Sequence, residues 1–261
     1  MPGSRPHWRA TRSTRWRDRP PAGLTVPELR VIPVEGLPEI HPGDVIAELV
    51  VAAARGQGTP LAAGDCLVVT QKIVSKAEGR LVALDPSDAA ARRALVESES
   101  VRVLRRRGEL VISETRHGFV CANAGVDLSN VDEGSAALLP MEPDRSAKRI
   151  RDGVRAHAGV DVAVVVSDTF GRAWRHGLTD VAIGVSGVAG VVDLRGQRDS
   201  RGRELAVTEV AVADEIASAA ELVMGKAAGV PVAIVRGLEP AWLRPGSARE
   251  LVRPPADDLF R

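Results

Sequence analysis

One stretch, residues 160–176, limits what the rest of the chain can fold into. It reads VDVAVVVSDTFGRAWRH and opens with an almost unbroken apolar run that is rich in β-branched valine. Such a run, bounded by Gly159 and Gly171, predicts a buried strand. The strand is expected to end at Ser167-Asp168-Thr169, so that one carboxylate and two hydroxyl groups would lie at its exit.

The polar end of this strand has two interpretations. Carboxylate and hydroxyl oxygens are ligands that Mg²⁺ and Mn²⁺ prefer. Arg172 and Arg175 follow in the same loop, and their guanidinium groups suit phosphate. The alternative is that Asp168 merely caps the turn after the strand, as aspartate often does. This stretch alone leaves both interpretations open.

The composition excludes several classes of protein. The chain has 261 residues, 44% hydrophobic and 26% charged, which is enough core for one large domain or two small ones. A net charge of +1, no tyrosine and three phenylalanines argue against a nucleic-acid partner. No apolar run reaches the roughly 18 residues that would span a membrane. Two cysteines fit no zinc or disulfide framework, and we expect a cytoplasmic protein.

Residues 1–29 differ from the rest of the chain. Six arginines alternate there with Pro, Ser and Thr, without apolar periodicity, which predicts a disordered basic arm. The arm could contact nucleic acid or a membrane, could be an upstream extension from a misassigned start codon, or could be a transit peptide. An ordered domain is expected over 30–250, followed by a Pro-rich tail at 251–261.

Strand and helix patterns occur in mixed order, which predicts an α+β fold. Strands are expected at 29–34, 66–70, 110–115, 118–122, 160–167, 181–188 and 230–237. Helices are expected after Asp44 as an N-cap, and over 85–107, 144–158 and 209–224. The run Arg105-Arg106-Arg107 would form the cationic last turn of the second helix, where it suits the helix dipole.

Two further segments carry candidate site residues. Lys72 and Lys76 are spaced i,i+4 and share one face of a helical turn, either as solvated charge or as phosphate ligands. Asp127 lies in the glycine-containing loop 123–131, which is either a turn or a second metal-binding loop. Separation along the sequence does not establish whether Asp127 and Asp168 converge.

The Gly225-Lys226 pair is not a phosphate-binding Walker A loop. That loop needs a glycine five residues before Gly225 and a serine or threonine after Lys226, whereas Ala220 and Ala227 stand there.

Four segments together resemble one family, the coenzyme F420-0:L-glutamate ligases. They are PVEGLP at 33–38, VSKAEG at 74–79, NAGVDLSNV at 123–131 and SDTFGR at 167–172, in the order and approximate spacing of that family. The segments ADEI at 213–216 and VRG at 235–237 match it too. The resemblance covers the chain from about Leu29 to Gly237.

The resemblance implies a reaction and a shape. GTP would phosphorylate a carboxylate of F420-0 to an acyl phosphate, which the amine of L-glutamate would attack to leave an amide, GDP and phosphate. Mg²⁺ or Mn²⁺ would be needed, with K⁺ as a helper. The protomer would be α+β and two-lobed, with a middle lobe inserted from about 81 to 177, and it would form a homodimer.

The resemblance also implies roles for single residues. Asp127 and Asp168 would hold one metal and Thr169 a second, while Lys76 and Arg172 would be catalytic. The nucleotide would contact Leu37, Pro38, Glu39, Ile40, Gln71, Lys76 and Asn130, and also Met224, Gly225, Lys226 and Gly229 of a loop that closes over it. Some relatives carry a carboxylate in this loop, so Lys226 leaves the ligand set of the second metal open.

Other readings of the same residues remain. A metal-dependent nucleotide phosphohydrolase would use the same aspartates with water as the acceptor. The motifs do not specify how many glutamates are added, nor whether a separate flavin-dependent reductase is a partner.

Overall fold

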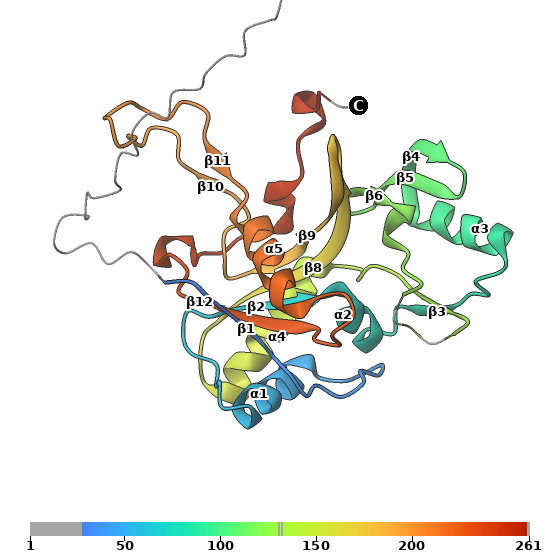
Figure 1. Ribbon diagram of the computed structural model, residues 1–261, viewed down its shortest axis with the longest axis horizontal. Helices are drawn as coiled ribbons and strands as arrows, with labels where there is room; N and C mark the ends of the chain where they lie inside the picture. Colours follow the sequence, from blue (N-terminus) through green and yellow to red (C-terminus); the bar gives the residue numbers. More distant parts are fainter. Residues whose placement is uncertain (1–27, 130, 132, 260–261) are drawn as a thin grey trace, which may run out of the picture.

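The computed structural model describes residues 28–129, 131 and 133–259. The predicted basic arm, apart from its last two residues, and Asn130 lie outside the described residues. A central five-stranded sheet, with helices on both faces, organises the molecule (Figure 1).

The central sheet has the strand order β1-β12-β2-β8-β9. Its strands are β1 (Arg30–Pro33), β12 (Val232–Arg236), β2 (Cys66–Thr70), β8 (Ala163–Arg172) and β9 (Arg175–Ser186). β2 and β8 run parallel, and the other neighbours are antiparallel. The β2 and β8 sequences are near-continuous apolar runs because helices cover both of their faces.

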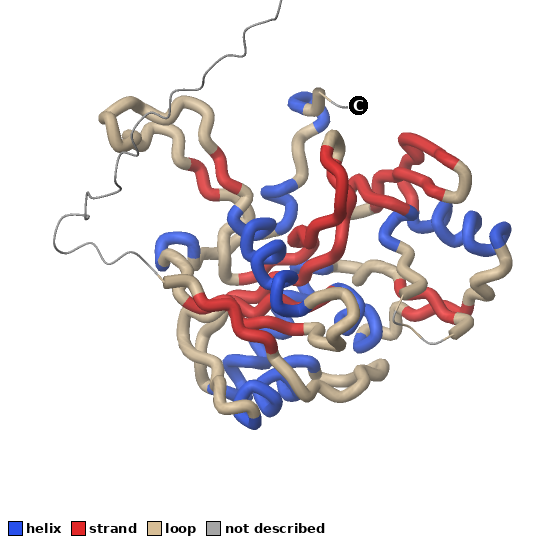
Figure 2. Tube along the Cα trace, in the orientation of Figure 1, coloured by secondary structure: helices blue, strands red, loops and turns tan. Residues whose placement is uncertain are grey.

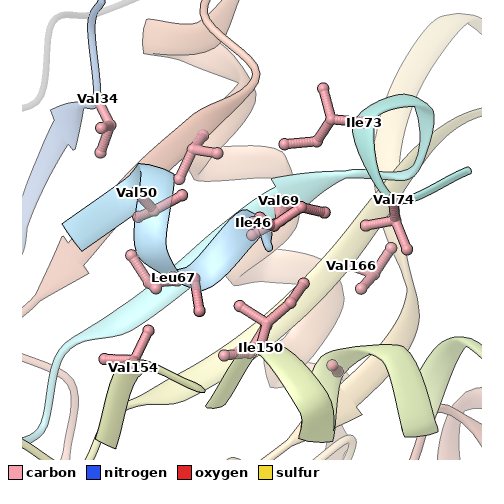
Figure 3. Close-up of a cluster of buried hydrophobic side chains, with 14 of the residues drawn as sticks. Val34, Ile46, Val50, Leu67, Val69, Ile73, Val74, Ile150, Val154 and Val166 are labelled. Carbon is pink, nitrogen blue, oxygen red and sulfur yellow. The ribbon is translucent and has the colours of Figure 1, made fainter. Parts of the chain in front are cut away.

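Alternate residues of each strand supply two cores, one on each face of the sheet. Helices α1 (Ile46–Gly56) and α4 (Pro143–Ala158) cover the face onto which Leu67 and Val69 point. Figure 3 shows Leu67 and Val69 among the side chains of these two helices. Helix α5 (Val212–Met224) covers the opposite face, with Cys66 and Val68 beneath it. This alternation fixes which residues of β8 can reach which side of the sheet.

Within the described part of the chain, three small sheets lie around the central one (Figure 2). They pair β3 (Leu81–Ala83) with β7 (Ser135–Ala137), β4 (Ser100–Arg107) with β5 (Leu110–Thr115) and β6 (Val120–Ala122), and β10 (Val192–Asp193) with β11 (Glu209–Val210). The remaining helices are α2 (Gln71–Ala77), α3 (Ala89–Glu99) and the short 3₁₀ turns η1 (Asn123–Gly125), η2 (Pro240–Trp242), η3 (Ala248–Leu251) and η4 (Pro255–Asp257). The α+β prediction is confirmed, whereas the lobe boundaries at 81 and 177 stay a prediction.

The predicted helix over 85–107 is wrong in its second half. Helix α3 ends at Glu99, and residues 100–107 form strand β4, which pairs with β5. Arg105, Arg106 and Arg107 therefore lie on a strand and do not form a helical last turn. The hairpin turns at Gly108, whose φ of 58° suits glycine. The pairing of residues 100–107 with the predicted strand at 110–115 cannot be inferred from the pattern of one segment alone.

Three other predicted boundaries move. Val45 is the N-cap of α1, and Asp44 instead accepts a hydrogen bond at Oδ2 from the backbone N–H of His41, at 2.7 Å. Helix α5 begins only at Val212, because residues 209–210 pair with β10. Strand β8 continues past Ser167 to Arg172, because β9 pairs with it along a long hairpin.

No helix within the described part of the chain is both long and apolar enough to cross a membrane.

Candidate functional site

The candidate site lies where the two parallel strands of the central sheet part. Thr70, the last residue of β2, pairs with Ser167 of β8. Beyond this pair the chain after β2 turns into α2, whereas β8 continues with Asp168 and Thr169. The carboxyl ends of parallel strands are the usual place for ligands in such sheets. The topology therefore brings the polar start of α2 close to the polar half of β8.

The first half of the site consists of Lys72 on α2, Asp127 and Ser129 in the loop before β7, and Asp168 on β8. Lys72 Nζ lies 2.9 Å from Asp127 Oδ2 and donates to Ser129 Oγ at 2.9 Å. Ser129 donates its backbone N–H and its hydroxyl to Asp127 Oδ1, at 2.7 and 2.8 Å. Two backbone hydrogen bonds with Ala137 hold the main chain of Asp127. Although desolvation opposes ionisation, the hydrogen bonds from Lys72 and Ser129 lower the pKa of Asp127.

Asp168 belongs to the same half. Its Oδ1 accepts a hydrogen bond from the backbone N–H of Thr169 at 2.8 Å. Desolvation raises the pKa of Asp168 to about 7; the Thr169 N–H opposes this rise, and the negative charges of Asp127 and Asp180 add to it. More negative than positive charge therefore surrounds this carboxylate, and a bound cation would favour its ionised form.

The second half of the site is centred on Asp180, whose side chain is 2% exposed. Its Oδ1 accepts from Thr169 Oγ1 at 2.7 Å and from Lys226 Nζ at 2.6 Å, and its Oδ2 accepts from Ser167 Oγ at 3.1 Å. Lys226 Nζ also lies 2.6 Å from Thr169 Oγ1 and 2.8 Å from Glu221 Oε1. The buried carboxylate is thus fully partnered by groups of this chain.

The two halves lie on opposite sides of β8. Successive side chains of a strand point to opposite faces. Asp168 interacts with Asp127 on one face, whereas Ser167 and Thr169 bond to Asp180 on the other. The charges of Asp168 and Asp180 still influence each other across the strand.

Asp127 and Asp168 are the residues of the first half that could hold one hard divalent cation. Both offer carboxylate oxygens, and of the two Lys72 contacts only Asp127, whose Oδ2 it would have to share or release. A cation there would offset the repulsion that adds to the effect of burial on the pKa of Asp168. Across residues 28–259, leaving aside 130 and 132, no three His, Cys, Asp or Glu side chains are grouped so that they could hold a metal. An ion there would complete its shell with oxygens of a substrate or of water.

Several predicted nucleotide contacts surround the first half. Lys76 forms an ion pair with Glu39 of the 37–40 loop, so these two predicted residues are brought together. Leu37 packs against the core and Ile40 is buried, which leaves Pro38 and Glu39 as the exposed part of this loop.

The side-chain amide nitrogen of Gln71 is hydrogen-bonded within the protein. Gln71 is buried, and its Nε2 donates to Ser75 Oγ at 2.7 Å and to the Leu138 carbonyl at 3.0 Å. Asn130, another predicted nucleotide contact, lies outside the described residues.

The remaining predicted residues are divided between two places. Gly225, Lys226 and Gly229 lie in the loop between α5 and β12, next to the second half of the site. Met224 is the last residue of α5 and its side chain is buried, 1% exposed, so only its backbone could contact a ligand. Arg172 is exposed at the end of the β8–β9 hairpin, and among the described residues it makes no hydrogen bond or ion pair with either half.

Sequence reasoning missed Asp180 and Glu221. Asp180 stands at the polar beginning of an apolar strand, where a lone aspartate usually belongs to a turn. The register of β8 with β9 places Asp180 opposite Thr169, and this pairing cannot be inferred from either segment alone. The spacing of Lys72 and Lys76 is compatible with phosphate binding, but it does not indicate that Lys72 pairs with Asp127.

A cavity of about 660 Å³ lies beside the β8–β9 hairpin. Phe119, Phe170 and Val181 form part of its apolar wall, and the rings of Phe119 and Phe170 meet edge to face at 6.3 Å. Its lining also includes three arginines, Arg102, Arg105 and Arg253. Phe170 shares a strand face with Asp168, two residues away, although Lys72, Asp127 and Asp168 are not among the residues that line the cavity.

A family model described as F420-0:Gamma-glutamyl ligase matches residues 36–237. The chain is 46% identical over 249 residues to a coenzyme F420:L-glutamate ligase of Methanothermobacter thermautotrophicus, covering 89% of this chain and 99% of that protein.

Two further relatives bear the same name. The identity is 45% over 254 residues for the protein of Methanopyrus kandleri, covering 90% of this chain and 99% of that protein. It is 41% over 247 residues for the protein of Archaeoglobus fulgidus, covering 89% and 96%. The residues matched by the family model include both halves of the site, whereas Arg253 of the cavity lies beyond them.

Proposed function

Because the chain belongs to the F420-0:γ-glutamyl ligase family, we propose that it joins L-glutamate to coenzyme F420-0 at the expense of GTP. The observation that carries this proposal is the convergence of Asp127, Asp168 and Lys72 beside the middle of β8, where β2 ends. These groups come from three separate segments of the chain: Asp127 and Asp168 lie in motifs of the family, and Lys72 lies two residues before the motif at 74–79.

The proposed chemistry proceeds in two steps. A carboxylate oxygen of F420-0 attacks the γ-phosphorus of GTP, the bond to the β–γ bridging oxygen breaks, and GDP leaves. The amine of L-glutamate then attacks the carbonyl carbon of the acyl phosphate. The C–O bond to phosphate breaks, the amine loses a proton, and an amide and inorganic phosphate remain.

The carboxylate of F420-0 and the γ-phosphate of GTP are both anions, so the residues of the site must offset their repulsion. Phosphoryl transfer depends mainly on positioning and on charge stabilisation. Lys72 and Lys76, on one face of α2, provide two positive charges beside the first half of the site. Mg²⁺ or Mn²⁺ held by Asp127 and Asp168 would supply further charge neutralisation at the phosphate oxygens.

We assign the ring system of F420-0 to the cavity beside Phe170. Its apolar wall suits a planar deazaflavin, and its three arginines suit anionic groups of the same molecule. Its position next to Asp168 would let the reacting carboxylate extend toward the first half of the site.

The proposal includes a homodimer. Trp174 and Leu178, at the tip of the β8–β9 hairpin, are 86% and 70% exposed. Large apolar side chains in such positions are typical of contact surfaces. The hairpin tip is therefore the place where we expect a second copy to bind.

An isotope experiment tests the acyl phosphate. F420-0 with both oxygens of its reacting carboxylate labelled with ¹⁸O is incubated with the protein, L-glutamate, GTP and Mn²⁺. The proposal predicts that one labelled oxygen leaves in the inorganic phosphate, seen by ³¹P NMR, and that the other stays in the amide. Unlabelled phosphate with formation of the amide would exclude the acyl phosphate. Phosphate release that needs no F420-0 would favour a phosphohydrolase.

A further inference from the structure

The ammonium group of Lys226 occupies the centre of the second half of the site. Its Nζ lies 2.6 Å from Asp180 Oδ1, 2.6 Å from Thr169 Oγ1 and 2.8 Å from Glu221 Oε1. These three oxygens come from β9, β8 and α5, so the lysine links three elements of the fold. Two carboxylates and a hydroxyl are also an oxygen set that a hard cation would use.

Asp180 needs a positive charge at this place. Its side chain is 2% exposed, and a buried carboxylate is costly unless a counter-charge and hydrogen bonds satisfy it. Ser167 and Thr169 supply two hydrogen bonds, and Lys226 supplies the charge. The lysine itself is half exposed and belongs to a loop that starts at Gly225, so its side chain reaches inward from the surface.

The Thr169 hydroxyl is already used in both of its capacities. It donates its proton to Asp180 Oδ1 and accepts a hydrogen bond from Lys226 Nζ. A metal ion on this oxygen would have to displace the ammonium group from the same three ligands. The second half of the site therefore does not fit a second metal while Lys226 is in place.

We infer that Lys226 is a tethered cation that fills a position a metal ion would otherwise take, so that the site binds divalent metal only at Asp127 and Asp168. The inference rests on the proposed function for the metal at these two aspartates. It replaces the role that the sequence suggested for Thr169, and it makes Lys226 a positioning residue that fixes Thr169 and Asp180 from the α5–β12 loop.

Counting bound Mn²⁺ tests this inference without any turnover. Mn²⁺ is titrated into the full chain in a buffer of tetramethylammonium salts, and the unbound ion is followed by electron paramagnetic resonance. We expect Lys226→Met, which keeps the length of the side chain but removes its charge, to bind one Mn²⁺ more per chain than the wild type. Lys226→Gln serves as a second variant, and circular dichroism verifies that each variant is folded.

A third variant locates the additional ion. Lys226→Met combined with Asp180→Asn removes a carboxylate ligand as well, so the additional Mn²⁺ should be lost again. Lys148→Ala is the matched control, because Lys148 is an exposed lysine paired with Asp152 on α4, away from the site. It should bind the same number of ions as the wild type.

The outcomes separate this inference from the proposed function. Equal Mn²⁺ counts for the wild type and for both folded Lys226 variants would overturn the inference. An additional ion that persists in the double variant would overturn it too, because the ion would then lie elsewhere. The wild-type count itself tests the metal at Asp127 and Asp168, and its value does not enter the difference between variant and wild type.

Discussion

Lys72 Nζ lies 2.9 Å from Asp127 Oδ2, and this ion pair connects the first turn of α2 with the loop before β7. The charge of Lys72 also acts on Asp168. One lysine thus stands beside both carboxylates that we assign to the metal. A metal ion and Lys72 would share the task of neutralising them, which leaves the lysine available for the phosphate groups of a substrate.

Replacing Asp168 by asparagine should abolish function without harming the fold. The change removes a negative charge that Asp127 and Asp180 repel, so the melting temperature should stay the same or rise. Turnover should fall on the order of 10²-fold or more, as expected for a group that organises charge in a transition state. Ligase assays and thermal unfolding measure both effects, with Asp152→Asn on exposed α4 as the control. Retained activity at saturating Mn²⁺ would remove Asp168 from the site.

Filling the cavity should weaken the binding of F420-0 alone. Val120 lines the cavity and is 37% exposed, so Val120→Trp adds volume there without disturbing the core. We expect the KM for F420-0 to rise about 10-fold or more, because a bulky ring would occupy the space of the ligand. The KM for GTP should not change. Equal rises in both KM values would argue against this place for the ring.

The ion pair between Asp65 and Arg236 should matter more for stability than any surface pair. Arg236 binds the buried Asp65 with two hydrogen bonds of 2.7 Å, and the Ala62 backbone N–H donates to the same carboxylate. Asp65→Asn should lower the free energy of unfolding by about 3 kcal/mol, since it leaves the arginine without its counter-charge. The exposed pair of Lys148 and Asp152 should contribute under about 1 kcal/mol when Asp152 is changed to asparagine.

Chemical denaturation is the measurement for this comparison. Similar losses of unfolding free energy in Asp65→Asn and Asp152→Asn would show that burial does not make the Asp65–Arg236 pair more important for stability.

Stability should decrease at alkaline pH partly because of Cys66. Burial raises the pKa of this thiol well above its ordinary value of 9.0, and the charge of Asp65 adds to the rise. Above pH 9 the unfolded chain loses the thiol proton while the native chain keeps it, so stability falls as pH rises. One thiol that titrates only in the unfolded chain lowers the free energy of unfolding by about 1.4 kcal/mol per pH unit.

A Cys66→Ala variant isolates the contribution of this thiol. Its free energy of unfolding should decline less steeply between pH 9 and 10.5 than that of the wild type. Parallel slopes would mean that Cys66 does not titrate differently in the two states. The comparison uses slopes, because the lost side chain lowers the stability of the variant at every pH.

The hairpin tip should decide the oligomeric state. Changing both Trp174 and Leu178 to serine removes the large exposed apolar side chains of the tip, and neither belongs to the buried core. We expect sedimentation velocity to show a dimer for the wild type and a monomer for this variant. A dimer in both cases would place the contact elsewhere.

Much of the central sheet could be predicted because its signals are local. The apolar runs at 66–70 and 163–166 and the alternation within them specify strands that helices cover on both faces. The strand at 100–107 could not be predicted, because its arginine-rich sequence gains its stability from pairing with β5. The local pattern predicts a helix, whereas pairing with the neighbouring strand β5 makes this segment a strand.

The residues of the site could be predicted where they lie within motifs of the family. Asp127 and Asp168 were found because each lies in a motif of the family, and the structure brings both to one side of β8. Asp180 and Glu221 lie outside those motifs, and their partner Lys226 was expected to contact a nucleotide. Their association depends on the register of β8 with β9 and on the end of α5, which no segment specifies alone.

Mass spectrometry of F420-0 after incubation with the purified chain, L-glutamate, GTP and Mn²⁺ tests the central claim most directly. The account predicts stepwise addition of glutamyl units to F420-0, with one GDP formed for each unit and no addition when GTP or Mn²⁺ is omitted. It would be contradicted by F420-0 of unchanged mass, whether GTP is hydrolysed or left intact.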